Sequence, residues 1–134
     1  MPEFNNTDSA WLNSISSIIL GASISVHREM GPGLLESVYQ HCLMLELRAK
    51  NLAIETLIPV PLSYKGTPID KTYVIDILVE SSIIVELKSV EILLPVHKAQ
   101  LVSYLKLSDK RLGFLINFNV PVLKQGFHRF VNKF

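Results

Sequence analysis

The sequence predicts an α/β sandwich with a mixed β-sheet flanked by helices. Two segments with helical spacing of their apolar residues open the chain, and three strand-like segments with near-continuous apolar runs follow. A third helical segment then separates these strands from a fourth. This order of elements is that of an α/β domain, and the continuous apolar runs indicate that both faces of the sheet are covered.

Length and composition fit one globular domain. The chain has 134 residues, 49% hydrophobic and 19% charged, and a chain of this size buries a core without covalent staples. We expect a flexible leader over 1–12 and a single domain over 13–134. Cys42 is the only cysteine, which excludes an internal disulfide and a cysteine-rich zinc site. Because no secretion signal or membrane-spanning run is evident, we expect a cytoplasmic protein without membrane contact.

Charge is unevenly distributed along the chain. Residues 1–97 hold 6 Lys/Arg against 11 Asp/Glu, a balance of −5, and residues 98–134 hold 7 Lys/Arg against 1 acid, a balance of +6. Acidic groups near a metal and a basic flank for a polyanion would produce this asymmetry. An ordinary solvated face on the last elements is the alternative.

Two helices are predicted at the start of the chain. Asn13 or Ser14 caps the first, whose apolar stripe comprises Ile15, Ile18, Ile19, Ala22 and Val26. The Gly-Pro-Gly run at 31–33 ends this helix, because glycine adopts the left-handed conformation and proline cannot continue the hydrogen-bond ladder. The second helix spans about 34–50, and Asn51 closes it. Its inward residues are expected to be Leu35, Val38, Cys42 and Leu45.

The spacing changes to that of strands after the second helix. An edge strand is predicted over 56–64, because Pro59 and Pro61 lack the N–H that a central strand needs. The following elements are a turn at 65–68, a strand over 69–80, a turn at Ser81-Ser82, a strand over 83–89, a helix from Pro95 to about 107, a strand over 111–118, and a strand or short helix within 123–134.

Three charged residues interrupt the apolar hairpin formed by the second and third strands. Asp76 lies in the first of them, and Glu86 and Lys88 lie two apart in the other, so the latter two project from one face. Buried charges are rare unless they are paired or bind a metal. A two-residue turn would set Asp76 opposite Leu87, on the wrong face, whereas a three-residue connection or a bulge sets it opposite Glu86. A functional site therefore requires an odd-length connection or a bulge.

If Asp76 and Glu86 share a face, the two carboxylates repel, which raises a pKa or recruits a cation. Ligands that are all oxygen atoms favour Mg²⁺ or Mn²⁺. Such an ion would polarise a phosphate and activate water for phosphodiester hydrolysis, and Lys88 would position that water or stabilise the developing charge. A buried salt bridge of Lys88 with one of the acids is the alternative.

Two helices carry residues that could complete this site. His97, Gln100 and Tyr104 form one polar stripe of the third helix, which lies either beside the metal or toward solvent. Glu36 and Tyr39 are neighbours on one face at the start of the second helix, where an acid also favours the helix dipole regardless of function.

The motifs along the chain form a set: Val26-His27-Arg28-Glu29-Met30-Gly31-Pro32, Gly33-x-x-Glu36-x-x-Tyr39, Asp76, Val85-Glu86-Leu87-Lys88, His97-Lys98-Ala99-Gln100 with Tyr104, and Leu115-Ile116-Asn117-Phe118. This set, over about 14–131, resembles that of the bacterial GxxExxY protein family, which is placed in the PD-(D/E)xK nuclease-like superfamily. Ile75 stands where the name of the superfamily has proline.

The resemblance implies a restriction-endonuclease-like core of order α-β-β-β-α-β, with the first helix as an addition. It implies that Asp76 and Glu86 are metal ligands, that Lys88 is the catalytic lysine, and that Glu36 lies near the metal as a further ligand. The supporting glutamine–tyrosine motif would be Gln100 with Tyr104. The residues expected to contact substrate are Tyr39, His97, Lys98 and Tyr104.

The expected function is Mg²⁺- or Mn²⁺-dependent hydrolysis of nucleic acid, with DNA favoured over RNA. One alternative is a nucleic-acid-binding or regulatory module that keeps the fold and turns over little. Another is an interaction protein whose charged strand residues form a buried salt-bridge set. Because no second domain for target selection is evident, a homodimer or a partner protein would have to supply targeting.

Overall fold

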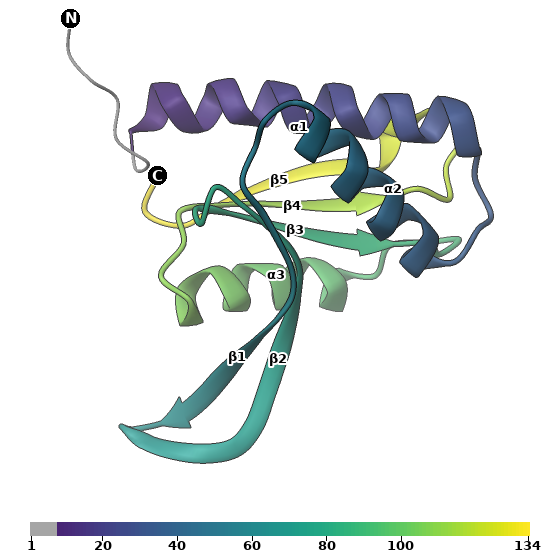
Figure 1. The fold of residues 1–134 in the computed structure, drawn as a ribbon. Coiled ribbons are helices and arrows are strands. Elements are labelled where there is room, and N and C mark those ends of the chain that lie inside the picture. Colours follow the sequence, from purple (N-terminus) through teal and green to yellow (C-terminus); the bar gives the residue numbers. More distant parts are fainter. Residues whose placement is uncertain (1–7) are drawn as a thin grey trace, which may run out of the picture.

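A computed structural model describes residues 8–134 as three layers, with a β-sheet between helices (Figure 1). Two helices, α1 (Ser9–Met30) and α2 (Glu36–Ala49), cover one face, and α3 (Pro95–Leu107) covers the other. The remaining elements are β1 (Ile54–Tyr64), β2 (Thr67–Val79), β3 (Ile83–Lys88), β4 (Leu112–Asn117), the short 3₁₀-helix η1 (Leu123–Gly126) and β5 (Phe127–Val131).

The sheet is mixed, as predicted. Its five strands lie in the order β1-β2-β3-β4-β5. Neighbouring strands are antiparallel except β3 and β4, which are parallel, and α3 makes the crossover that a parallel pair needs. The predicted α/β class, the edge position of β1 and the bounds of α3 are confirmed. The tail, where strand and helix remained open, contains both: η1 and then β5.

Helix α1 begins earlier than predicted. Asp8 is its N-cap, because the carboxylate oxygen Oδ1 accepts hydrogen bonds from the backbone N–H of Ala10 at 2.8 Å and of Trp11 at 3.2 Å. The predicted cap residue Ser14 lies inside the helix, where its hydroxyl donates to the carbonyl of Trp11. The other predicted cap, Asn13, is also helical. Residues 1–7 of the expected leader lie outside the described residues.

The end of α1 is the one predicted, since Gly31 has a φ of 71° and closes the last turn through its N–H. By length and composition alone, α1 is long and apolar enough to cross a membrane, a test that core helices also pass. Its apolar stripe packs in the core of the domain.

The predicted inward face of α2 is only partly right: Cys42 packs against the core and Val38 is half-buried, but the other two predicted residues are exposed. Tyr39, Leu43 and Leu47 are fully buried and follow one another at intervals of four residues. In contrast, Leu35 is 74% exposed and Leu45 is 54% exposed. Apolar residues lie on both sides of this helix, so its spacing alone could not identify the face that packs on the sheet.

Each face of the sheet has its own hydrophobic core. The core under α1 and α2 includes Ile77, Val79, Ile83, Val85, Leu87, Phe114 and Ile116 from the strands. The core under α3 includes Tyr73, Ile75, Leu78, Ile84 and Leu115 from the strands. The expectation that both faces are covered is therefore confirmed.

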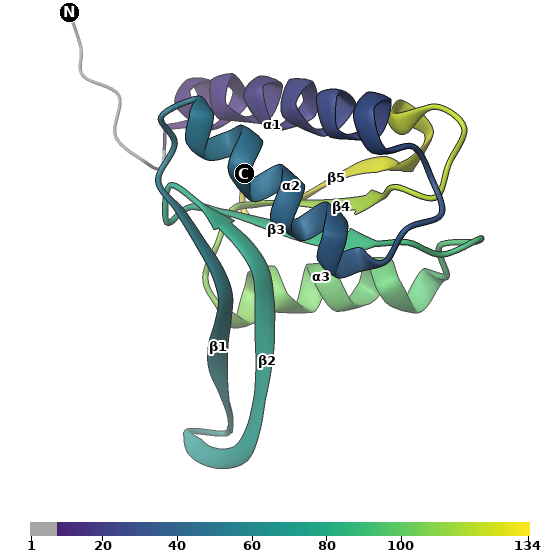
Figure 2. The ribbon, with the colours of Figure 1, turned by 45° about the vertical axis from the view of Figure 1, so that its right-hand side comes forward.

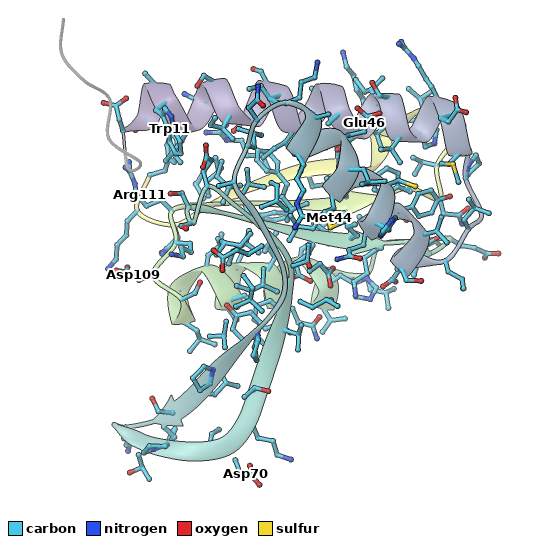
Figure 3. The ribbon with its side chains drawn as sticks, viewed as in Figure 1. Trp11, Met44, Glu46, Asp70, Asp109 and Arg111 are labelled. Carbon is cyan, nitrogen blue, oxygen red and sulfur yellow. The ribbon has the colours of Figure 1, made fainter. Side chains whose placement is uncertain are left out.

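The hairpin of β1 and β2 extends well beyond the rest of the sheet (Figures 1 and 2). Figure 3 shows Asp70 near its far end. Its inner face packs against the α3 side through Ile58, Val60 and Leu62. Its outer face is exposed and carries Leu57, Pro59, Pro61 and Val74.

Strand β2 twists sharply where the hairpin leaves the sheet. Ile77 belongs to the core under α1 and α2, whereas Ile75, two residues earlier, belongs to the core under α3. Residues two apart in a flat strand would face the same side. The change of face occurs at Asp76.

Candidate active site

The connection between β2 and β3 has the odd length that a shared site requires. Glu80, Ser81 and Ser82 separate the two strands. The register is defined by three antiparallel pairs: Ile77 with Val85, Leu78 with Ile84, and Val79 with Ile83. Continuing this register sets Asp76 opposite Glu86. The prediction of an odd-length connection is confirmed.

The two strands separate at Asp76, and the Asp76 side chain takes up a position between them. Backbone pairing of β2 with β3 stops at Ile77. Beyond that point the carboxylate oxygen Oδ2 of Asp76 accepts a hydrogen bond from the backbone N–H of Leu87 at 2.9 Å. This bond ties Asp76 to the segment that carries Glu86 and Lys88.

Glu86 is a half-buried acid with one buried, unsatisfied oxygen. Its atom Oε1 is buried and has no hydrogen-bond partner among the residues that the structure describes. Burial, and next the neighbouring carboxylate of Asp76, raises the pKa of Glu86 to about 8. Burial also raises the pKa of Asp76, against the lowering effect of the Leu87 N–H. Without a cation, the pair therefore holds a proton near neutral pH.

Lys88 lies on the same sheet face as Glu86, two residues further along β3. Its positive charge slightly lowers the pKa of both carboxylates, although burial dominates the shifts. A salt bridge that fully satisfied Glu86 would leave no buried oxygen without a partner, and Oε1 lacks one. The salt-bridge alternative thus does not account for this acid.

Glu36 approaches the pair from the start of α2. After burial, its negative charge is among the causes that raise the pKa of Asp76. A hollow of about 230 Å³ lies between α2 and the strands, and its lining residues are Glu36, Ser37, Gln40, Leu57, Asp76 and Leu87. Glu36 and Asp76 therefore face one hollow, as the sequence led us to expect.

The donor set fits a hard divalent cation. Among residues 8–134, no group of three or more His, Cys, Asp or Glu side chains is close enough to form a preassembled metal site. Mg²⁺ needs no such cage, because it keeps several waters and binds through one or two carboxylates plus substrate phosphate. Asp76 and Glu86 supply these carboxylates, and the partnerless oxygen of Glu86 is free to coordinate.

The polar stripe of α3 is only partly directed at the acids. Tyr104 lies near the two acids: after burial, the charges of Glu86 and Asp76 raise its pKa. Gln100 is exposed one turn earlier on the same helix face. His97 has a structural contact, since its ring nitrogen Nδ1 accepts a hydrogen bond from the backbone N–H of Leu94 at 3.1 Å, where α3 begins.

Two predicted substrate contacts are not brought to the acids. Lys98 lies toward β5, where its charge, after burial, lowers the pKa of His128. Tyr39 is completely buried and stacks on Phe118 with ring centroids 4.5 Å apart. As placed, Tyr39 offers no surface to a substrate, and its prediction as a substrate contact is not supported.

The hydroxyl of Tyr39 organises the loop that precedes Glu36. It donates to the carbonyl of Gly31 and accepts from the backbone N–H of Leu34. We expect Tyr39→Phe to lower the free energy of unfolding by about 1–2 kcal/mol, because both backbone groups lose this partner. Urea denaturation would measure the change, and Tyr64→Phe at the exposed hairpin end is the control. An unchanged unfolding midpoint for Tyr39→Phe would contradict this role.

Sequence reasoning missed Tyr73. This residue of β2 stacks on Tyr104 with ring centroids 3.9 Å apart and an interplanar angle of 4°, and its hydroxyl donates to the carbonyl of Tyr104 at 3.1 Å. Burial raises its pKa, and the charge of Glu86 contributes. Its place three residues before Asp76 carried no signal, because only the twist of β2 brings it under α3.

The fold is an α/β domain consistent with a nuclease-like core: two N-terminal helices, then a five-stranded mixed sheet with one inserted helix. The chain matches the family model of the PD-(D/E)XK nuclease superfamily over residues 13–130, and it belongs to that superfamily. Members typically use divalent metals. The curated proteins and solved structures compared with the chain gave no match. The predicted superfamily is confirmed, and the finer likeness to the GxxExxY family stays a prediction.

Proposed function

We propose that this protein is a divalent-metal-dependent nuclease that hydrolyses phosphodiester bonds in nucleic acid. The observation that carries the proposal is the meeting of Asp76 and Glu86 where β2 and β3 separate, with a buried carboxylate oxygen that has no partner. Two neighbouring carboxylates, one of them with a buried oxygen that has no partner, destabilise a protein when ionised unless a cation joins them. The arrangement is therefore better explained by metal binding than by stability.

Each residue of the proposed site would have its own role in the hydrolysis. Asp76 and Glu86 would hold Mg²⁺ or Mn²⁺, with Glu36 across the hollow, directly or through water. When bound, the ion supplies a Lewis acid that polarises the phosphate and activates the attacking water. Lys88 would orient that water or stabilise the charge that develops on the phosphate. Gln100 and Tyr104 would support the substrate side from α3.

Nucleic acid is the substrate that the charge distribution favours. Three of the seven basic residues of 98–134 line one hollow of about 270 Å³, together with a single acid: Lys110, Arg111 and Lys133, with Asp109. Figure 3 shows Arg111 at the end of the sheet where β4 begins, opposite the end of β3 that carries Lys88. A basic surface away from the acids would attract the phosphate backbone without neutralising the metal site. We propose DNA ahead of RNA.

A nucleic-acid-binding module with little turnover is the second candidate. It is favoured by one observation, the lack of a preassembled three-residue metal group among the described residues. Such a module would bind nucleic acid with the same salt dependence, but it would not need Mg²⁺.

The test is cleavage of single-stranded DNA, duplex DNA and RNA with Mg²⁺, with Mn²⁺ and with chelator. We expect metal-dependent cleavage, most active on DNA, which Lys88→Ala lowers by about a hundredfold or more while Mn²⁺ binding by calorimetry persists. Lys65→Ala, at the exposed hairpin turn, is the matched control. Binding without cleavage would favour the second candidate, and cleavage unaffected by Lys88→Ala would refute the mechanism.

A further inference from the structure

We propose that Asn117 is a positioning residue that sets the end of β3, and with it Lys88, relative to the acid pair. This inference rests on the proposed function. Asn117 is only 3% exposed, and it and Ser23 are the two buried polar residues in the described part of the chain. Ser23 donates to the carbonyl one turn back in its own helix, whereas Asn117 bonds to a distant segment.

The Asn117 side chain binds both backbone groups of Val90. Its amide oxygen Oδ1 accepts from the Val90 N–H at 3.1 Å, and its amide nitrogen Nδ2 donates to the Val90 carbonyl at 2.8 Å. The same oxygen also accepts from the Asn119 N–H at 3.2 Å. A buried amide with these three bonds is well satisfied, and removing it would leave the backbone groups of Val90 without partners.

These bonds continue the pairing of β3 with β4 after β3 has ended. Lys88 is the last residue of β3 and is in register with Asn117 on the parallel neighbour, so the two side chains share one sheet face. The Lys88 carbonyl accepts from the Phe118 N–H at 3.0 Å. The Lys88 backbone is therefore held to β4 at its own carbonyl and again at Val90, two residues later.

The same short segment also reaches the Glu36 side of the site. Ser89, between Lys88 and Val90, donates from its hydroxyl to the carbonyl of Leu34, two residues before Glu36. Through Val90 and Ser89, Asn117 therefore holds the β3 end in a fixed relation to the loop that leads into α2. Displacement of about 1 Å at a reacting group is enough to lower a rate by about a hundredfold.

Asn117→Ala tests the inference against the other buried polar residue. Ser23 is also fully buried, but its hydroxyl bonds within α1, to the carbonyl of Ile19, and it lines neither the hollow of Asp76 nor the hollow of Lys110. We expect Asn117→Ala to lower kcat on DNA by about tenfold to a hundredfold, with KM and Mn²⁺ affinity within about twofold of the unmodified protein. Ser23→Ala should keep its kcat.

Loss of kcat to the same extent in both variants, at equal folded fraction, would overturn the inference. A second readout does not depend on cleavage: NMR of the protein with ¹³C-methylated lysines, in which Lys88→Arg identifies the Lys88 signal. We expect Asn117→Ala, but not Ser23→Ala, to shift that signal. If the unmodified protein binds Mn²⁺ and cleaves nothing, the proposed function fails while this signal still decides the role of Asn117, and an unmoved Lys88 signal refutes it.

Discussion

Asp76→Asn is expected to abolish metal binding and to lower cleavage by about a thousandfold or more. The amide oxygen of asparagine can still accept the Leu87 N–H, which Oδ2 of Asp76 accepts at 2.9 Å, so the junction of β2 and β3 should remain intact. What is lost is one of the two negative charges that favour a divalent cation. Calorimetry with Mn²⁺ and a cleavage assay with Mg²⁺ measure the two effects.

Asp70→Asn supplies the control for this experiment. Asp70 lies on the same strand, but it is exposed near the far end of the hairpin. The control should bind metal and cleave like the unmodified protein. If Asp76→Asn keeps its fold by circular dichroism and still binds Mn²⁺ with undiminished affinity, Asp76 is not a metal ligand and the proposed centre is wrong.

Glu86→Gln is expected to stabilise the metal-free protein at pH 8. The pKa of Glu86 is raised from 4.5 to about 8 in the folded state, chiefly by burial. The folded protein therefore binds this proton more tightly than the unfolded chain does. The stabilisation from that proton is complete below pH 4.5 and is lost as the pH rises through about 8. Glutamine keeps the neutral form at every pH, so the variant should not show this loss.

The expected difference at pH 8 is a few kcal/mol, because each unit of pKa shift corresponds to about 1.4 kcal/mol. Urea denaturation with chelator at pH 5 and pH 8 would measure it, and Glu55→Gln on exposed β1 is the control. Mn²⁺ should raise the free energy of unfolding of the unmodified protein at pH 8 and have little effect on that of Glu86→Gln. A variant that is less stable at both pH values would show that the ionised carboxylate is satisfied within the protein.

Local signals in the sequence were sufficient where the chemistry of a glycine or a proline allows only one backbone arrangement. The end of α1 at Gly31, the start of α3 at Pro95 and the edge position of β1 follow from glycine and proline chemistry. The start of α1 did not, because Asp8, Asn13 and Ser14 are all good caps and only the structure shows which one is used.

The meeting of Asp76 and Glu86 could be predicted from the sequence only if the connection between their strands had an odd length. Strand alternation places Glu86 and Lys88 on one face, but whether Asp76 joins them depended on the length of the connection at Ser81-Ser82, which sequence left open. The contacts of Tyr73 and Asn117 depend on the twist of β2 and on a side-chain bond across 27 residues. Such contacts have no local pattern, because they arise when separate elements pack.

The prolines of β1 have a consequence for self-association. Strand β1 is one of the two edge strands of the sheet, and its Pro59 and Pro61 pair with Val74 and Thr72 of β2. Because a proline has no N–H to donate, the outward side of β1 offers an incoming strand an interrupted row of donors. A protruding ribbon with exposed apolar side chains would otherwise invite edge-to-edge aggregation. An incoming strand would therefore pair poorly with β1, so growth of the sheet from one chain to the next is disfavoured at this edge.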